Sequence, residues 1–249
     1  MSKTKKRSAP VPQMSKQEKR RAEQEQQKQK TRILIVSTVA IVVIIFVALF
    51  MLASKDSSST TADPVNFNYS EMPRLGNEDA PVKLVEFGDY KCPACAQFAG
   101  GIKPQIVQKY IEEGKAALYF VNMAFIGPDS ETASLAALSV YHQSNDEFWK
   151  FYDAIYKNQG AEDVEWATAD YLVELAQKEK LAIDYDLLRK DIENRTYAEE
   201  LSRDIQLAND SKVTTTPSLF INGVMTAEPF NFEAISAQID EVAQAVKAE

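Results

Sequence analysis

The sequence predicts an α/β domain that follows a single N-terminal membrane-spanning helix. Three observations in the 249-residue chain support the α/β domain. A short apolar stretch at residues 82–87 leads into a CxxC motif, residues 129–210 look helical throughout, and Asn222-Gly223 joins two short strands near the C-terminus. This order of elements (βαβ, helices, ββα) predicts one sheet whose connectivity is interrupted by a helical insertion at about residues 128–211.

The N-terminal region predicts a membrane anchor. Residues 33–53 contain no charged side chain. As a helix they would span roughly 31 Å, about the thickness of the hydrocarbon core of a bilayer. Residues 1–32 carry eleven Lys and Arg against three Glu, a net charge of +8. The positive-inside rule therefore places this basic arm in the cytoplasm and the chain after residue 53 outside the cell.

Two other interpretations of the N-terminal region fit less well. A cleaved signal peptide would have an apolar region of about 7–15 residues, which is shorter than the run at residues 33–53. The basic arm could bind nucleic acid, but its position beside the apolar run favours contact with lipid headgroups. Because the whole chain carries −8, the part after residue 32 carries −16, which also argues against a nucleic-acid partner.

The rest of the chain predicts a tether followed by one domain. Residues 54–70 include five consecutive Ser and Thr and predict a flexible linker, so the domain is expected over residues 71–249. Its expected elements are a covered strand at 82–87, a helix from the CxxC motif to about 113 with a bend near 100–104, a strand at 116–125, a hairpin of strands 218–221 and 224–226, and a closing helix at about 232–248.

The chain has only two cysteines, and their spacing indicates redox chemistry. A disulfide between Cys92 and Cys95 would close a loop of four residues, which stabilises a fold by only about 2 kcal/mol. A structural zinc site needs four ligands, but the chain has a single histidine, so no metal site and no other cofactor is predicted. A CxxC motif between a strand and a helix is instead typical of a thioredoxin-like dithiol.

The expected position of the motif also predicts which sulfur reacts. Cys92 would be the N-cap of the helix and Pro93 its first residue, where the missing N–H costs nothing. The backbone N–H groups of Ala94 and Cys95 would then point at the Cys92 sulfur and lower its pKa. We therefore expect Cys92 to be exposed and reactive and Cys95 to be its buried partner.

Residues 85–95 (VEFGDYKCPAC) and residues 213–223 (VTTTPSLFING) together resemble the DsbA family. With the N-terminal anchor, the chain is most similar to the membrane-bound BdbD type of Gram-positive bacteria. The resemblance covers the chain from about Leu75 onward. It implies a thioredoxin-like fold with a helical insertion and a CxxC pair that introduces disulfides into exported proteins. The inner dipeptide Pro93-Ala94 differs from that of the family's best-known member, which has a histidine there, and this dipeptide tunes the redox potential.

Two further sites follow from the sequence and the resemblance. On its own, Pro217 could be a trans proline that opens an edge strand. The resemblance implies instead a cis Thr216–Pro217 bond that faces the CxxC motif and offers backbone groups to an extended substrate. Glu86 shares a strand face with Val82 and Leu84, so we expect it to be at least partly buried, although an exposed strand-end carboxylate is the alternative. The family places an acidic residue there, which implies a role in moving the proton of Cys95.

These features predict a membrane-anchored, extracytoplasmic thiol–disulfide oxidase. Its expected partners are reduced secreted proteins and, from the resemblance alone, a DsbB-like, quinone-linked membrane protein that reoxidises it. The nearest alternative is a reductase or isomerase that uses the same dithiol. An alternative of another class is a non-catalytic binding module tethered to the membrane. Insulin-reduction and hirudin-refolding assays separate the three.

Overall fold

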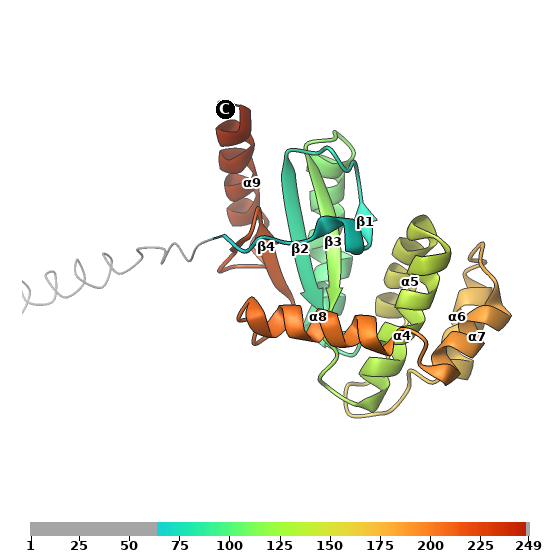
Figure 1. The fold of residues 1–249 in the computed structure, drawn as a ribbon. Helices are drawn as coiled ribbons and strands as arrows, with labels where there is room; N and C mark the ends of the chain where they lie inside the picture. The colour runs from blue at the N-terminus through green and yellow to red at the C-terminus, as the bar shows by residue number, and fades with distance from the viewer. Residues whose placement is uncertain (1–63, 248–249) are drawn as a thin grey trace, which may run out of the picture. The chain divides into compact units, whose positions relative to one another are not determined.

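The computed structural model describes residues 64–247, which form a five-stranded sheet with helices on both faces (Figure 1). The sheet has the order β1-β3-β2-β4-β5, with β2 and β3 parallel and the other neighbouring pairs antiparallel. The strands are β1 (Arg74–Leu75), β2 (Val82–Gly88), β3 (Ala116–Asn122), β4 (Ser218–Ile221) and β5 (Val224–Met225). The strands predicted at 82–87, 116–125, 218–221 and 224–226 are all present, and β1 is an addition.

The predicted basic arm at residues 1–32 and membrane anchor at residues 33–53 lie outside the described residues. Among residues 64–247, no helix combines the length and the apolar character needed to cross a bilayer.

The helix after the CxxC motif runs without a break from residue 93 to residue 111, but it is not a regular α-helix. Its α-helical parts, α2 (Pro93–Gln97) and α3 (Lys103–Ile106), alternate with the π-helical turns η2 (Phe98–Ile102) and η3 (Val107–Ile111). Gly100 and Gly101 lie in the first wide turn, and Pro104, which has no N–H to donate, follows it directly. At the place where a bend was predicted, near residues 100–104, the structure has a locally widened π-helical turn, Phe98–Ile102.

The helical insertion comprises α4 (Pro128–Gln143), α5 (Asn145–Lys157), α6 (Ala169–Lys178), α7 (Tyr185–Asn194) and α8 (Ala198–Asp210), and α9 (Phe232–Lys247) closes the domain. The side chains of Ser144, Thr168 and Asp184 accept backbone N–H groups at the starts of α5, α6 and α7. The expectation of helix throughout residues 129–210 is wrong for residues 158–168, which form an irregular segment.

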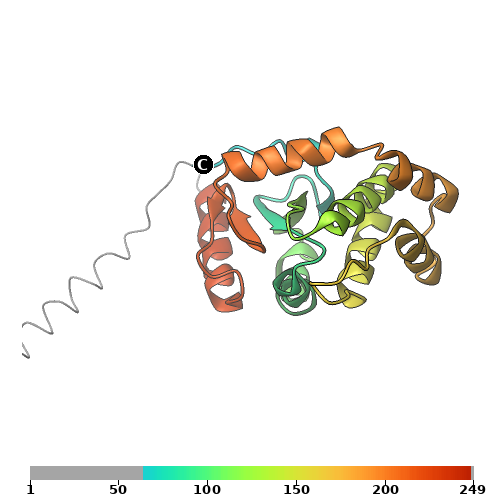
Figure 2. The same ribbon diagram turned by 90° about the horizontal axis from the view of Figure 1, so that it is seen from below.

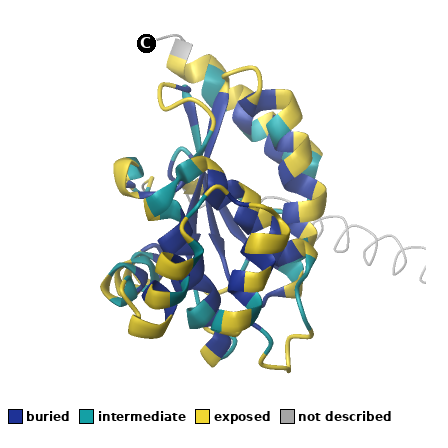
Figure 3. Ribbon diagram, turned by 90° about the vertical axis from the view of Figure 1, so that its right-hand side faces the viewer, coloured by how far each residue is buried: buried dark blue, intermediate teal, exposed yellow. Residues whose placement is uncertain are grey.

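The sheet lies between two layers of helix. Figure 2 shows α8 along one face, with the helix of residues 93–111 and α9 along the other. The alternation of side chains in β2 matches these layers: Val82 and Leu84 pack in one hydrophobic cluster, and Val85 and Phe87 pack in a second. Burial is concentrated along the strands and the inward helix faces, as Figure 3 shows.

The folded domain begins earlier than residue 71, because residues 64–70 lie against the sheet. Phe67 is 4% exposed, and its ring packs against Phe87 and Phe220 at centroid distances of 6.0 and 5.3 Å. The Val65 N–H donates to the carbonyl of Gly223 at 2.9 Å. The flexible linker predicted at residues 54–70 is therefore wrong for its last seven residues, where aromatic side chains provide apolar surface that the sheet buries.

The hairpin predicted at Asn222-Gly223 is confirmed. Both residues have positive φ, 45° and 82°, as the tight turns that join antiparallel strands require. A side chain at Gly223 would place its Cβ 2.3 Å from the Val65 carbonyl oxygen, so glycine also allows the N-terminal segment to approach this turn.

Candidate active site

The CxxC motif begins the helix that follows the central strand β2. Cys92 is the N-cap with extended backbone angles, and Pro93 occupies the first helical turn, both as predicted. The Ala96 N–H donates to the Cys92 carbonyl at 3.2 Å and so closes the first turn. The N–H of Cys92 is itself bound by the Asp89 carbonyl at 3.0 Å, which fixes the turn between strand and helix.

Cys92 is more enclosed than expected. Cys95 has no exposed surface, as predicted, but Cys92 is only 8% exposed, so the expectation of an openly exposed Cys92 is wrong. The cover comes from the far end of the chain: the Cys92 Sγ–H donates to the carbonyl oxygen of Thr216 at 3.4 Å. The Thr216–Pro217 peptide bond is cis. It lies beside Cys92, the position that the resemblance implies.

The structure strongly separates the proton affinities of the two thiols. The pKa of Cys92 is lowered from 9.0 to about 6, chiefly because the Cys95 thiol donates a hydrogen bond to its sulfur. Burial opposes this lowering, while Thr216 and the backbone N–H groups of Cys95 and Ala94 add to it. Burial raises the pKa of Cys95, and the hydrogen bond to Cys92 and the charge of Glu86 raise it further.

The helix N-terminus was expected to be the main cause of the low Cys92 pKa. It contributes through two backbone N–H groups, but the neighbouring thiol contributes more. The protonated Cys95 thiol therefore stabilises the Cys92 thiolate more than the helix N-terminus does.

Glu86 lies on β2 under the motif and is completely buried, which removes the alternative of an exposed strand-end carboxylate. The Tyr152 hydroxyl lies 2.9 Å from Oε1 and 2.8 Å from Oε2. Burial raises the pKa of Glu86 to about 8, against the lowering effects of the Tyr152 hydrogen bond and of Lys103. Glu86 can therefore hold or release a proton close to neutral pH, and its charge raises the pKa of Cys95.

Three site residues were not predicted from the sequence. The Gln159 side-chain amide donates to the carbonyls of Tyr90 and Cys92 at 2.9 and 3.0 Å. Buried Lys91 forms an ion pair with buried Asp129, with 2.6 Å between Nζ and Oδ1. These contacts hold the irregular segment 158–168 beside the cysteines.

Asp129 is the anchor of that segment. Its Oδ2 accepts the backbone N–H groups of Trp166 and Ala167 at 2.9 and 3.1 Å, so these groups do not enter a helix. Lys91 Nζ also donates to the carbonyl of Val164 at 3.1 Å. The partners lie 37 or more positions apart in sequence, and the only local signal was an acidic residue in the first turn of a predicted helix.

Asp89 organises the loop after the neighbouring strand. Its carboxylate accepts the backbone N–H of Lys91 at 2.8 Å and those of Phe125 and Ile126 at 2.9 and 3.1 Å. These contacts explain why β3 ends at Asn122 and not at Phe125, since the backbone after Asn122 turns towards Asp89. Within residues 64–247, no group of three or more His, Cys, Asp or Glu side chains is arranged to hold a metal ion.

The ionisation of the reduced site is directly measurable. In the reduced protein, the thiolate absorbance in the ultraviolet is expected to rise with a midpoint near pH 6, because the Cys95 thiol and nearby N–H groups stabilise the Cys92 thiolate. A Cys92→Ser variant should lack this transition, since Cys95 does not ionise in the neutral range. A midpoint above about pH 8, the ordinary range of a thiol, would contradict the arrangement.

The chain is similar to known proteins over most of its length. A family model described as Thioredoxin matches residues 69–241. The probable disulfide bond formation protein D of Bacillus cereus is 40% identical over 175 residues, which cover 70% of this chain and 80% of that protein. Disulfide bond formation protein D of Bacillus subtilis is 33% identical over 169 residues, which cover 68% of this chain and 76% of that protein.

Solved structures lead to the same family. The crystal structure of oxidised BdbD from Bacillus subtilis matches with a TM-score of 0.69 and 31% identity, and the match covers 74% of this chain and all of that chain. DsbA of Chlamydia trachomatis, 24% identical with a TM-score of 0.65, shares the fold over 75% of this chain and 97% of its own. From the fold, the matched length and the identity to the Bacillus proteins, the chain belongs to the thioredoxin-like DsbA family as a relative of BdbD, and it is a thiol–disulfide oxidoreductase.

Proposed function

We propose that the protein is a disulfide-forming oxidase that acts on reduced exported proteins through the Cys92–Cys95 pair. The observation that carries this proposal is the difference between the two thiols, with the pKa of Cys92 lowered to about 6 and that of Cys95 raised. A cysteine that is stable as a thiolate is a good leaving group, so a disulfide containing it is readily transferred to another protein. The names of the Bacillus relatives, which describe disulfide bond formation, support the same direction.

The exchange has two steps. A client thiolate attacks Cys92 Sγ of the oxidised pair, the Cys92–Cys95 bond breaks, and Cys95 leaves with the electron pair and takes up a proton. The proposed donor of this proton is Glu86, which is buried and whose charge raises the pKa of Cys95. A second client thiolate then attacks the client sulfur of the mixed disulfide. The client disulfide forms and Cys92 leaves as a thiolate, so that two electrons remain on the protein.

Client recognition is proposed at the segment that covers Cys92. Thr216 and Pro217 lie at the start of β4, with the Thr216 carbonyl directed at the Cys92 sulfur. An extended client chain that displaces this contact could pair with the backbone there, which would make recognition largely independent of client sequence.

The cellular setting is part of the proposal. Residues 33–53 would anchor the protein in the cell membrane, with the basic arm in the cytoplasm and the redox domain outside. Disulfides persist in such an oxidising compartment. Because each turnover leaves two electrons on the protein, an oxidant must remove them, and we propose a DsbB-like, quinone-linked membrane protein for this step.

Stability as a function of pH and redox state tests the direction of exchange. The lowered pKa of Cys92 stabilises only the reduced folded protein, and this contribution is absent below pH 6 and grows to about 4 kcal/mol above pH 9. Closing the four-residue loop favours the oxidised protein by about 2 kcal/mol at every pH. We therefore expect the reduced protein to melt several degrees higher than the oxidised protein at pH 9, and the difference to vanish or reverse by pH 6.

The same samples distinguish the alternatives. Equilibration with glutathione gives the redox potential, insulin reduction reports a reductase, and hirudin refolding reports an oxidase or isomerase. An oxidised form that melts higher throughout pH 6–9 would indicate a reductase. If a Cys92→Ser variant keeps both the insulin-reduction and the hirudin-refolding activity, the dithiol is not the reactive site. This outcome would favour a binding module.

A further inference from the structure

The buried carboxyl group of Glu86 depends on one side chain from the helical insertion. Glu86 has no exposed surface, and among the described residues its carboxylate oxygens are hydrogen-bonded by a single side chain, Tyr152 of α5. The hydroxyl lies within 2.9 Å of both oxygens, so one phenol holds both sides of the carboxyl group. Tyr152 is itself completely buried, so bulk water does not compete for this hydrogen bond.

The other ionisable groups around Glu86 do not replace this hydrogen bond. Tyr90, from the loop after β2, and Tyr156, from α5, have buried hydroxyls that find no partner among the described residues. Both rings pack on Tyr152, at centroid distances of 6.2 and 4.8 Å. Cys95 of α2 is also fully buried, and the charge of Glu86 raises its pKa. Glu86 is thus surrounded by neutral donors and a thiol.

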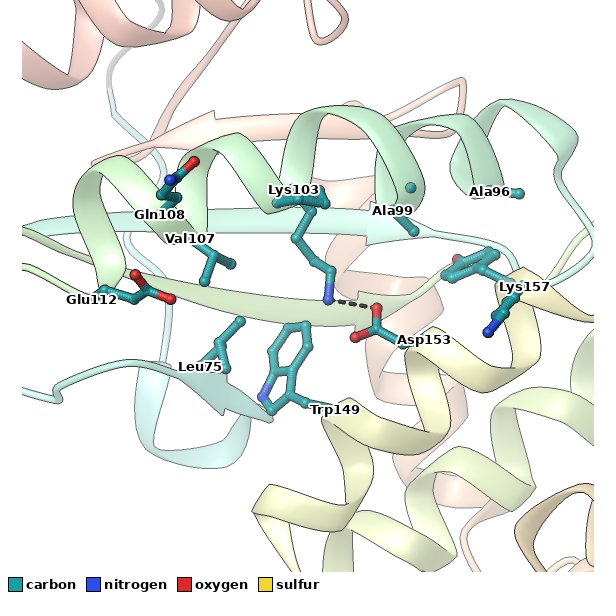
Figure 4. Close-up of a pocket in the computed structure, with 13 residues that line it drawn as sticks. Leu75, Ala96, Ala99, Lys103, Val107, Gln108, Glu112, Trp149, Asp153 and Lys157 are labelled. Atoms are coloured by element: carbon teal, nitrogen blue, oxygen red, sulfur yellow. Dashed lines mark ion pairs between the residues drawn. The ribbon is translucent and has the colours of Figure 1, made fainter. Parts of the chain in front are cut away.

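The nearest cation is already paired. Lys103 of α3 is 5% exposed, and its Nζ lies 2.6 Å from Oδ1 of Asp153 on α5 and 4.8 Å above the Tyr152 ring. Lys103 and Asp153 both line a pocket of about 650 Å³ between the helix of residues 93–111 and α5. Figure 4 shows their ion pair among the side chains that line it. Asp153 is more than half exposed, so the Lys103 charge is balanced on the solvent side and does not reach Glu86 as a hydrogen-bond donor.

We propose that Tyr152 is a positioning residue for the redox pair, whose hydroxyl holds Glu86 beneath Cys95 and determines the pH at which Glu86 exchanges a proton with that thiol. This inference rests on the proposed role of Glu86. When Cys95 leaves the disulfide as a thiolate, protonated Glu86 gives up its proton and becomes a carboxylate, and Tyr152 stabilises the new charge without ionising. On reoxidation the proton returns from Cys95 to Glu86. The insertion thereby contributes to the chemistry of a thioredoxin-like site through one hydroxyl.

Tyr152→Phe removes the hydroxyl and keeps the ring. Glu86 of the reduced protein is observed by NMR of a sample labelled with ¹³C in the Glu side chains, and Glu86→Gln identifies its signal. Because a hydrogen bond to a charged group is lost, Glu86 is expected to titrate about 1–2 pH units higher in Tyr152→Phe than in the parent. The pH profile for reduction of the oxidised protein by a small dithiol is expected to shift by the same amount.

A matched control separates this role from general packing. Tyr110 is also fully buried and donates its hydroxyl to the Ser236 carbonyl at 3.2 Å, and among the described residues it has no hydrogen bond to Glu86 or to the cysteines. Tyr110→Phe should leave both the Glu86 titration and the rate profile unchanged. In a Glu86→Gln background, Tyr152→Phe should cause no further shift of the profile, because the group it acts on is gone.

The outcomes are distinct. An unchanged Glu86 titration in a folded Tyr152→Phe protein would overturn the proposal. A shifted Glu86 titration with an unshifted rate profile would also overturn the proposal, because Glu86 would then not be the proton partner of Cys95. The glutathione potential would still report separately whether the protein is an oxidase. If Tyr152→Phe does not fold, the hydroxyl proton of Tyr152 in the parent should change its NMR shift as Glu86 titrates, and a constant shift would overturn the proposal.

Discussion

Cys92→Ser is expected to reduce the rate of reaction with a small aromatic disulfide at pH 7 by at least about 100-fold relative to Cys95→Ser. The Cys92 thiolate, with a pKa of about 6, is roughly nine-tenths ionised at that pH, whereas a thiol at or above its ordinary value is at most about 1% ionised. The sulfur that remains in Cys92→Ser is also wholly buried. The measurement is the release of the aromatic thiol, followed by absorbance. Neither variant should introduce disulfides catalytically, because both have lost the exchangeable pair.

The Cys95 variants provide an internal control. In Cys95→Ser a hydroxyl can still donate a hydrogen bond to the Cys92 sulfur, whereas in Cys95→Ala no donor remains. Since this hydrogen bond is the largest cause of the low pKa, Cys92 should titrate at higher pH in Cys95→Ala than in Cys95→Ser. Comparable reaction rates for Cys92→Ser and Cys95→Ser would mean that the two thiols are not differentiated as the structure indicates.

Asp129→Ala is expected to lower the free energy of unfolding by about 3–5 kcal/mol, because it leaves the Lys91 ammonium buried without a counter-ion. It also removes the acceptor of the Trp166 and Ala167 N–H groups, so the irregular segment 158–168 loses its attachment. Urea unfolding of the fully reduced protein measures the change, and amide hydrogen exchange should show faster opening confined first to this segment.

A surface ion pair serves as the control for this loss. Asp170 pairs with Arg189 between α6 and α7, but the Asp170 side chain is 77% exposed. Asp170→Ala should therefore change the free energy of unfolding by less than about 1 kcal/mol. If Asp129→Ala is equally mild, the Lys91–Asp129 pair does not support the active-site loop.

The parts of the fold that local patterns determine were predicted well. β2, the helix start at the CxxC motif and the Asn222-Gly223 turn each have a signal within a few residues. β1 has only two residues, Arg74–Leu75, too few for any periodicity, and it forms because β3 offers a free edge. The ordered segment before it was missed because Ser- and Thr-rich residues precede it, and its Phe67 gains its packing only from the completed sheet.

The chemistry of the site was predictable to the extent that it is local. The CxxC spacing identifies Cys92 and Cys95 as a candidate redox pair. The alternation of side chains in β2 places Glu86 on the same face as Val82 and Leu84. Their partners are remote: Tyr152 lies 66 positions from Glu86, and Gln159 lies 67 positions from Cys92. No periodicity connects such positions, so the cover over Cys92 and the single hydrogen-bonding side chain of Glu86 had to come from three-dimensional structure.

The sheet order has a consequence for synthesis of the chain. Central strand β2 is flanked by β3 on one side and by β4 on the other, and β4 is made only after all of α4–α8. Thr216 follows Cys92 by 124 positions. During synthesis from the N-terminus, more than a hundred further residues are therefore added after the dithiol before the segment that covers Cys92 is made. Until that segment is synthesised, the cysteine pair lacks its cover and is open to premature oxidation or to mixed disulfides with folded copies of the same protein.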